Sequence, residues 1–86
     1  MANIRIGTNG AATVGRLLQE IGENGGVDPD VRRNAARYSS AVRRRMDRRD
    51  VETIASVLRA VSSSGQYPSS RRERAQYWAA YLEGRI

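Results

Sequence analysis

Large apolar side chains are scarce in this chain, and their scarcity limits how it can fold. Leu, Ile and Val together number sixteen in 86 residues, just under a fifth, and Phe is absent. With a net charge of +6, this composition lies near the boundary at which chains stay disordered. Cysteine is also absent, so no disulfide can reinforce a small core. The chain must therefore bury nearly all of its apolar residues in one domain, with a second copy as one possible source of further buried surface.

The apolar residues recur at helical spacing in four stretches of the chain. In the first stretch, for example, Val14, Leu17, Leu18 and Ile21 form one stripe at the i, i+3, i+4, i+7 spacing of a helix face. The second stripe continues through Val42 to Met46, and the third and fourth have the same spacing. The stripes predict helices from Ala11 or Thr13 to Glu23, from Pro29 to about Met46–Arg48, from Val51 to about Ser63, and from Ser69 or Ser70 to near Gly84.

Residue types typical of helix ends support these boundaries. Asp28 followed by Pro29 fits the N-cap and first position of the second helix, and Asp50 fits the N-cap of the third. Ser70 and Glu73 have the spacing of a capping box, and Gly65 has the position of a C′ residue. The pair Gly25-Gly26 is expected to stop the first helix, and Tyr67, before Pro68, to anchor the last loop.

Residues 1–10 do not continue the helical pattern. Ile4 and Ile6 alternate and are followed by two glycines, which fits either a short strand or an extended arm. Because so short a strand is unstable alone and would have to pair with a strand of another copy, we favour the arm. The predicted fold is an all-α small bundle of about four short helices, with an N-terminal arm over 1–10 and a single helical domain over 11–86.

The absence of His, Cys and Lys excludes many chemistries. No thiolate nucleophile, cysteine-bound zinc, histidine base or lysine Schiff base is possible, and the nine acids are scattered among fifteen arginines. We therefore expect a protein that is not an enzyme and needs no metal or cofactor. No apolar run approaches the ~20 residues that span a bilayer, and residues 1–6 do not resemble a secretory signal, so we expect a cytoplasmic protein with no membrane partner.

Arginine is concentrated in one part of the chain. Residues 31–50 hold eight arginines and two aspartates, which accounts for the whole net charge. If the second helix runs to Arg48, the side chains of Arg33, Arg37, Arg44 and Arg48 form a ridge of about 22 Å, with Ser40 between them and Arg32 and Arg43 beside it. Such a ridge suits successive phosphates of a nucleic acid. The alternative is a solvated helix face, paired with Glu20, Glu23 or Glu83.

A second basic group opens the fourth helix, where Arg71, Arg72 and Arg74 follow two serines. Serine, arginine and glutamine side chains can reach base edges, so the third and fourth helices could form a unit similar to a helix-turn-helix. The turn is longer than usual for that motif, and we favour ordinary capping as the role of Ser70 and Glu73. The segment Gly7–Gly10 could wrap an anion with its backbone amides, but we favour simple flexibility there.

The aromatic residues divide into two groups. Tyr38 and Trp78 fall on apolar stripes and are expected to pack in the core. Tyr77 and Tyr81 flank the stripe of the fourth helix, next to Trp78. Because interfaces are enriched in Tyr and Trp, we predict that Tyr77, Trp78 and Tyr81 form an oligomer interface, with a base-stacking patch beside Arg74 as the alternative.

These observations leave several functions open. The first is a small DNA-binding regulator, a homo-oligomer that contacts phosphates through its arginines. The second is an interaction module or inhibitor that docks onto an acidic protein, because guanidinium groups also bind carboxylates in a bidentate manner. RNA or a small anionic ligand is a third possibility. The predicted anion-binding residues are Arg33, Arg37, Arg43, Arg44, Arg48, Arg71, Arg72 and Arg74.

Overall fold

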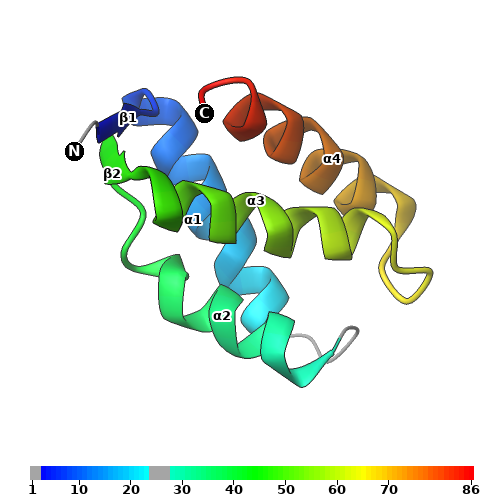
Figure 1. Cartoon of the computed structure of the whole chain (residues 1–86). Coiled ribbons are helices and arrows are strands. Elements are labelled where there is room, and N and C mark those ends of the chain that lie inside the picture. Colours follow the sequence, from blue (N-terminus) through cyan, green and yellow to red (C-terminus); the bar gives the residue numbers. More distant parts are fainter. Residues whose placement is uncertain (1–2, 24–27) are drawn as a thin grey trace.

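The computed structural model describes residues 3–23 and 28–86, which form a small helical domain (Figure 1). The predicted class of a small bundle of four short helices is confirmed, and a sheet of two short strands accompanies the helices. The glycines expected to stop the first helix, Gly25 and Gly26, lie outside the described residues. The elements in chain order are β1 (Asn3–Arg5), α1 (Thr8–Glu23), α2 (Pro29–Ser39), β2 (Arg45–Asp47), α3 (Arg48–Ser62) and α4 (Ser69–Glu83).

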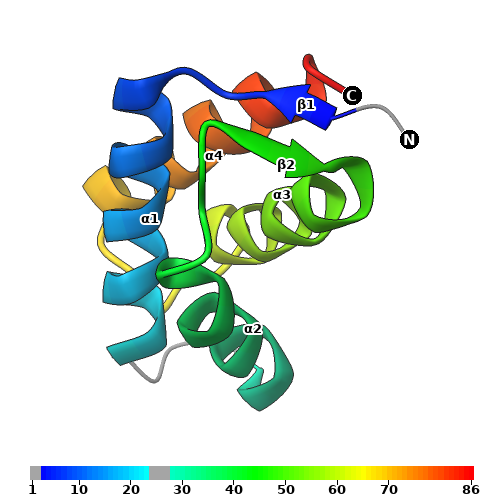
Figure 2. The same cartoon turned by 90° about the vertical axis from the view of Figure 1, so that its left-hand side faces the viewer.

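The helices pack as two pairs, α1 with α2 and α3 with α4. The sheet lies at the end of α1 where that helix begins, whereas α2 lies beside its other end (Figure 2). The sheet and the start of α1 are therefore neighbours, and this brings the first residues of the chain next to the segment that follows α2.

Within the described ranges, no helix combines the length and the apolarity that a membrane span requires.

One core takes up the scarce apolar residues. Every described Leu, Ile and Val is either buried or packed against the buried cluster. The stripe predicted for α1 is confirmed, because Val14, Leu17, Leu18 and Ile21 are all at most 1% exposed. Trp78 and Tyr38 also pack partly buried against this core, and Tyr67 is buried in the last loop, as predicted. A single copy of the chain thus builds a continuous core.

Glycines inside α1 permit the close approach of α2. A Cβ at Gly22 would lie 3.1 Å from Cα and Cβ of Ala36, and one at Gly15 would lie 3.1 Å from the backbone oxygen of Ser39. Both distances are tighter than those of most real Cβ contacts, so a side chain at either position would crowd α2. The two glycines therefore lower the intrinsic stability of α1 but let the backbone of α2 pack directly on it.

The predicted extent of α2 is wrong, because the helix ends at Ser39 rather than near Met46. The Ser39 hydroxyl donates to the Ala36 carbonyl at 2.8 Å, a local bond that competes with helix continuation. A longer helix would also stack Arg44 on Arg48 at i, i+4, which is unfavourable for like charges. The chain instead extends, and Met46 is buried as the inward residue of β2.

The first residues form a strand, and its partner is in the same chain. β1 pairs antiparallel with β2, with Ile4 opposite Met46 and Arg5 opposite Arg45. The preference for an unpaired arm, and the expectation that a strand would need another copy, are therefore wrong. Burial of Ile6 anchors this pairing, and α1 begins directly afterwards at Thr8, earlier than predicted.

The helix caps agree with the sequence only at α2. Asp28 caps it, because its side chain accepts from the Asp30 N–H at 2.8 Å, and Pro29 occupies the first turn. The other predicted caps are wrong. Asp47 rather than Asp50 is the N-cap of α3, and Pro68 precedes α4 without a side-chain cap bond. The end of α3 at Ser62 agrees with the prediction, but its C-cap is Ser63, so the C′ position falls on Ser64 rather than on Gly65.

Charged and polar side chains link the helices. Arg59 of α3 donates to both carboxylate oxygens of Glu83 on α4, at 3.0 and 2.6 Å. These hydrogen bonds hold the pKa of the Glu83 carboxyl below its ordinary value. The Tyr38 hydroxyl donates to a carboxylate oxygen of Asp50 at 3.1 Å and so connects α2 to α3.

Candidate anion-binding site

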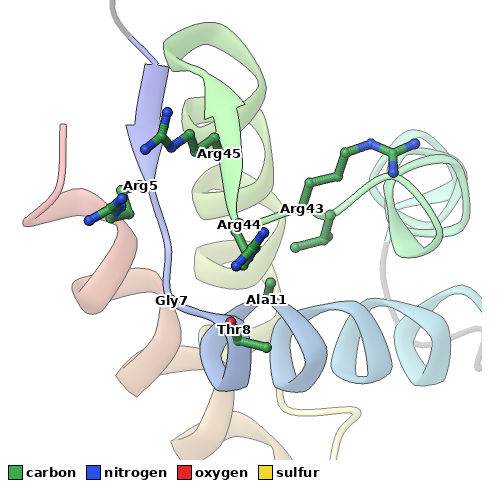
Figure 3. Close-up of a pocket in the computed structure, with 8 residues that line it drawn as sticks. Arg5, Gly7, Thr8, Ala11, Arg43, Arg44 and Arg45 are labelled. Carbon is green, nitrogen blue, oxygen red and sulfur yellow. The ribbon is translucent and has the colours of Figure 1, made fainter.

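Four arginines surround a pocket at the start of α1. Arg5 comes from β1, while Arg43, Arg44 and Arg45 belong to the segment that leads from α2 into β2. The pocket has a volume of about 940 Å³, and its remaining lining comes from the beginning of α1 and the segments beside it (Figure 3). We call these four residues the arginine pocket. Its other lining residues are Gly7, Thr8, Ala11 and Val42.

The sheet register places these arginines on the surface. Ile4 and Met46 face the core as a pair, so the neighbouring pair, Arg5 and Arg45, faces outward. The Ile6 N–H donates to the Arg44 carbonyl at 2.6 Å, which holds Arg44 beside the point where α1 begins. The short alternation of apolar and basic residues in both strands therefore determines the position of the charges.

The start of α1 adds backbone donors to the pocket. The Ala11 N–H makes a helical bond to the Gly7 carbonyl at 2.9 Å, so the N–H groups of Thr8, Asn9 and Gly10 have no acceptor within the helix. The first turn of α1 contains no acidic residue that would compete for these donors. The positive end of the helix dipole thus points to the same place as the four arginines.

The positive charge of the pocket is not neutralised by the protein. Among residues 3–23 and 28–86, no carboxylate lies within 4.0 Å of the guanidinium group of Arg5, Arg43, Arg44 or Arg45. Asp47 is only two residues beyond Arg45 on β2, yet it forms no ion pair with it. Like charges directly opposite each other in a sheet are destabilising. An anion would therefore relieve a repulsion that the fold itself creates.

The four side chains spread out rather than converge on one point (Figure 3). The Arg44 guanidinium lies over the start of α1 near Thr8 and Ala11, whereas Arg43 extends toward α2. Arg45 extends across the sheet toward β1, on which Arg5 lies opposite it. This spread matches an extended chain of anionic groups better than a single small anion.

The predicted ridge on one long helix does not exist, because its members belong to three parts of the chain. Arg33 and Arg37 lie on α2, Arg44 lies in the connecting segment, and Arg48 is the first residue of α3. Arg33 pairs with Asp30 at 3.1 Å and Arg48 with Glu52 at 3.4 Å, all four side chains being exposed. The partners expected for the ridge, Glu20, Glu23 and Glu83, make no ion pair with it.

At the start of α4, two of the three predicted anion-binding arginines contact a carboxylate. Arg71 and Arg74 both approach the same oxygen of Glu20 on α1, each at 3.3 Å. The Arg71 guanidinium also lies over the ring of Tyr67, 5.6 Å from its centroid. The Nε atoms of Arg71 and Arg72 are buried without a hydrogen bond. These contacts connect α4 to α1, and Arg71 and Arg74 are correspondingly less available to a ligand.

The aromatic residues predicted to form an oligomer interface lie together on α4. The Trp78 ring makes edge-to-face contacts with Tyr77 and Tyr81, with centroids 5.0 and 5.1 Å apart. Trp78 and Tyr81 pack partly against the core, whereas Tyr77 is 63% exposed. The guanidinium group of Arg85 lies over the Tyr81 ring, 4.6 Å from the ring centroid.

Sequence reasoning missed Arg5 and Arg45, half of the arginine pocket. The available signal was the alternation of Ile4, Arg5 and Ile6 and of Arg45, Met46 and Asp47, which is typical of half-buried strands.

In the described part of the chain, no three acidic residues come together as metal ligands. Comparison with known protein families, with curated proteins and with solved structures yields no match for this chain.

Proposed function

We propose that this protein is a non-enzymatic nucleic-acid-binding regulator, with DNA as its first candidate ligand, and that the arginine pocket contacts the phosphate backbone. The supporting observation is the gathering of Arg5, Arg43, Arg44 and Arg45 at the start of a helix without a carboxylate partner among the described residues. Guanidinium groups bind phosphate oxygens in a bidentate manner, and a helix N-terminus adds backbone donors.

The spread of the side chains favours a polymer of phosphates. Successive phosphates on one DNA strand are separated by several ångströms, and Arg43, Arg44 and Arg45 extend in different directions from one short segment. Phosphate contacts of this kind orient a protein on a duplex but carry no sequence information. The pocket therefore supports general affinity, and selection among sequences would require further contacts.

An acidic protein is the competing ligand, because carboxylates and phosphates use the same guanidinium donors. The two ligands differ in their response to salt. DNA releases condensed counterions when arginines neutralise its phosphates, and log K then falls linearly with log salt by about 0.9 per phosphate. An acidic protein surface carries no comparable condensed layer of ions, so its binding should fall less steeply with salt.

The proposal is tested by fluorescence anisotropy with a labelled random-sequence duplex of about 30 base pairs over a salt series. We expect micromolar binding at low salt, with a slope of about 3 to 4 if all four arginines contact phosphate. The double variant Arg44→Gln/Arg45→Gln should lower that slope by about 2. Single-stranded RNA of equal length, measured in parallel, shows whether the ligand is restricted to DNA.

A control with the same loss of charge separates the pocket from general electrostatics. Arg33→Gln/Arg48→Gln also removes two positive charges, but from arginines that already pair with Asp30 and Glu52. We expect the slope for this variant to change by less than half as much as for the pocket variant. Equal losses in both variants, or no binding at low salt, would contradict the proposal, and the second outcome would favour an acidic protein.

A further inference from the structure

The outward face of α4 carries an ordered stripe that the core does not use. Glu73, Tyr77, Ala80 and Gly84 are all exposed, and they lie opposite the buried residues Ala75, Ala79 and Leu82. Their spacing of four, three and four residues keeps them on one side of a helix and is the spacing by which one helix contacts another. Tyr77 is the exposed large hydrophobic residue of the described chain.

The α4 stripe has its large residues, Glu73 and Tyr77, toward the start of the helix and its small residues, Ala80 and Gly84, toward its end. Tyr77 stands beside a shallow pocket of about 500 Å³, which is lined also by Glu73, Gln76, Ala80 and Tyr81. When two such helices meet in antiparallel directions about a point between positions 77 and 80, Tyr77 of one faces Ala80 of the other. The same register places Glu73 opposite Gly84, so each large side chain meets a small one.

The charges near the two ends of the α4 stripe are also self-complementary, with Glu73 inside the stripe and Arg85 one residue beyond it. Glu73 and Arg85 form no ion pair within the described residues, and Arg85 contacts only the ring and hydroxyl of Tyr81. An antiparallel arrangement brings Glu73 of one copy beside Arg85 of the other, twice. It also sets the two helix dipoles against each other in the favourable direction. A parallel arrangement would instead place Glu73 beside Glu73.

We infer that the α4 stripe binds a second copy of this chain, forming a symmetric dimer through antiparallel α4 helices. Base stacking is the less favourable use of the same face. The stripe contains a carboxylate and no arginine, and the neighbouring Arg74 pairs with Glu20, so phosphates would approach Glu73 without a compensating charge. Because a single pair of short helices buries less than a standard interface, we expect a weak dimer rather than an obligate one.

Chemical cross-linking tests the direction and the register. The chain has no cysteine, so single introduced cysteines react alone. In the proposed register the two copies of position 80 are about 4.5 Å apart along the helix axis, and the two copies of position 73 about 16 Å apart. A short bismaleimide should link Ala80→Cys to itself. It should not link Glu73→Cys to itself, but should link Glu73→Cys to Gly84→Cys in a mixture of the two variants.

Sedimentation equilibrium without nucleic acid tests the association independently of the proposed function. Tyr77→Glu should raise the dimer dissociation constant at least tenfold, whereas Ser56→Arg, on the exposed side of α3, should not change it. Glu73→Arg and Arg85→Glu should each weaken the dimer, and the double variant should restore it. Far-UV circular dichroism verifies that each variant is folded. A monomer at all concentrations up to about 1 mM, or self-linking of Glu73→Cys, would overturn the inference.

Discussion

Arg5 and Arg45 face each other across a sheet of only two short strands, so removing one charge should stabilise the protein while weakening its ligand binding. We consider Arg45→Gln, which keeps a long polar side chain and removes the charge. Both residues are exposed, and they form a directly opposed pair in the register. Two-stranded sheets are marginal in stability, so the repulsion between opposed charges is a sizeable part of the local balance.

The magnitude follows from the separation of the two charges. Opposed side chains have Cβ atoms about 5 Å apart, and a guanidinium separation of about 7 Å in water corresponds to a repulsion of about 0.6 kcal/mol. For a chain of this length, that gain raises the Tm by about 2–5 °C at low ionic strength. At physiological salt the charges are about one Debye length apart, so the gain should fall by roughly half.

Bound nucleic acid should reverse the order of stability of the wild-type protein and the Arg45→Gln variant. At a DNA concentration of about 100 times the wild-type Kd, binding stabilises the wild-type protein by about 2.7 kcal/mol. Loss of one phosphate contact at low salt weakens binding about tenfold, which leaves about 1.4 kcal/mol of stabilisation for the variant. The difference of about 1.3 kcal/mol exceeds the gain from relieved repulsion, so the wild-type protein then becomes the more stable one.

Thermal unfolding followed by the fluorescence of Trp78, the only tryptophan, measures both effects. Arg32→Gln removes an exposed arginine from α2 that has no arginine across a strand, so we expect no gain in stability from it. The reasoning would be refuted if Arg45→Gln lowered the Tm of the free protein, or if Arg32→Gln raised it equally. If Arg45→Gln remained more stable than the wild-type protein in saturating DNA, the role of Arg45 in binding would be refuted.

Four further changes test the fold that holds the pocket in place, each measured by urea or thermal unfolding. Gly22→Val should destabilise by about 1–3 kcal/mol through overpacking against α2, whereas Gly65→Ala, with open space around it, should be neutral or stabilising by about 0.4–1 kcal/mol. Tyr38→Phe should cost about 0.5–1.5 kcal/mol by removing the hydrogen bond to Asp50. The pKa of the Glu83 carboxyl is lowered in the folded protein. This carboxyl therefore stabilises the fold fully above its ordinary pKa, and the effect is lost as the pH falls through the lowered value. Glu83→Gln should consequently lower the Tm at neutral pH but not in strong acid.

The local patterns were sufficient to predict three of the helices. Continuous apolar stripes identified α1, α3 and α4, because each stripe matches only the helical period over eight residues or more. The length of α2 was not predictable in the same way. Met46 is four residues after Val42, as in a helix, but it is also flanked by Arg45 and Asp47, as in a strand. One apolar residue cannot distinguish the two periods, and long-range pairing with Ile4 decided between them.

The candidate site was only partly predictable for the same reason. Arg43 and Arg44 were among the predicted anion-binding residues, but they were placed on a helical ridge that the structure does not contain. Arg5 joins them through a strand pairing that spans about 40 positions of the chain, and no local spacing encodes such a contact. The glycines of α1 show the converse. Their cost to helix stability follows from the residue type alone, but the packing of α2 against them depends on the fold.

The fold separates its arginines by what they contact. Arg59, Arg71 and Arg74 pair with carboxylates on a different helix, and through these pairs α3 contacts α4 and α4 contacts α1. The arginine pocket has the opposite character, because its four charges come from two distant segments and accumulate where a helix dipole is already positive. Such an accumulation lowers the stability of the free protein, and the core of a single copy does not require it. Its physical consequence is a strong local attraction for anions, and for this reason we place the proposed ligand at the pocket rather than at the more arginine-rich surface of α2 and the start of α3.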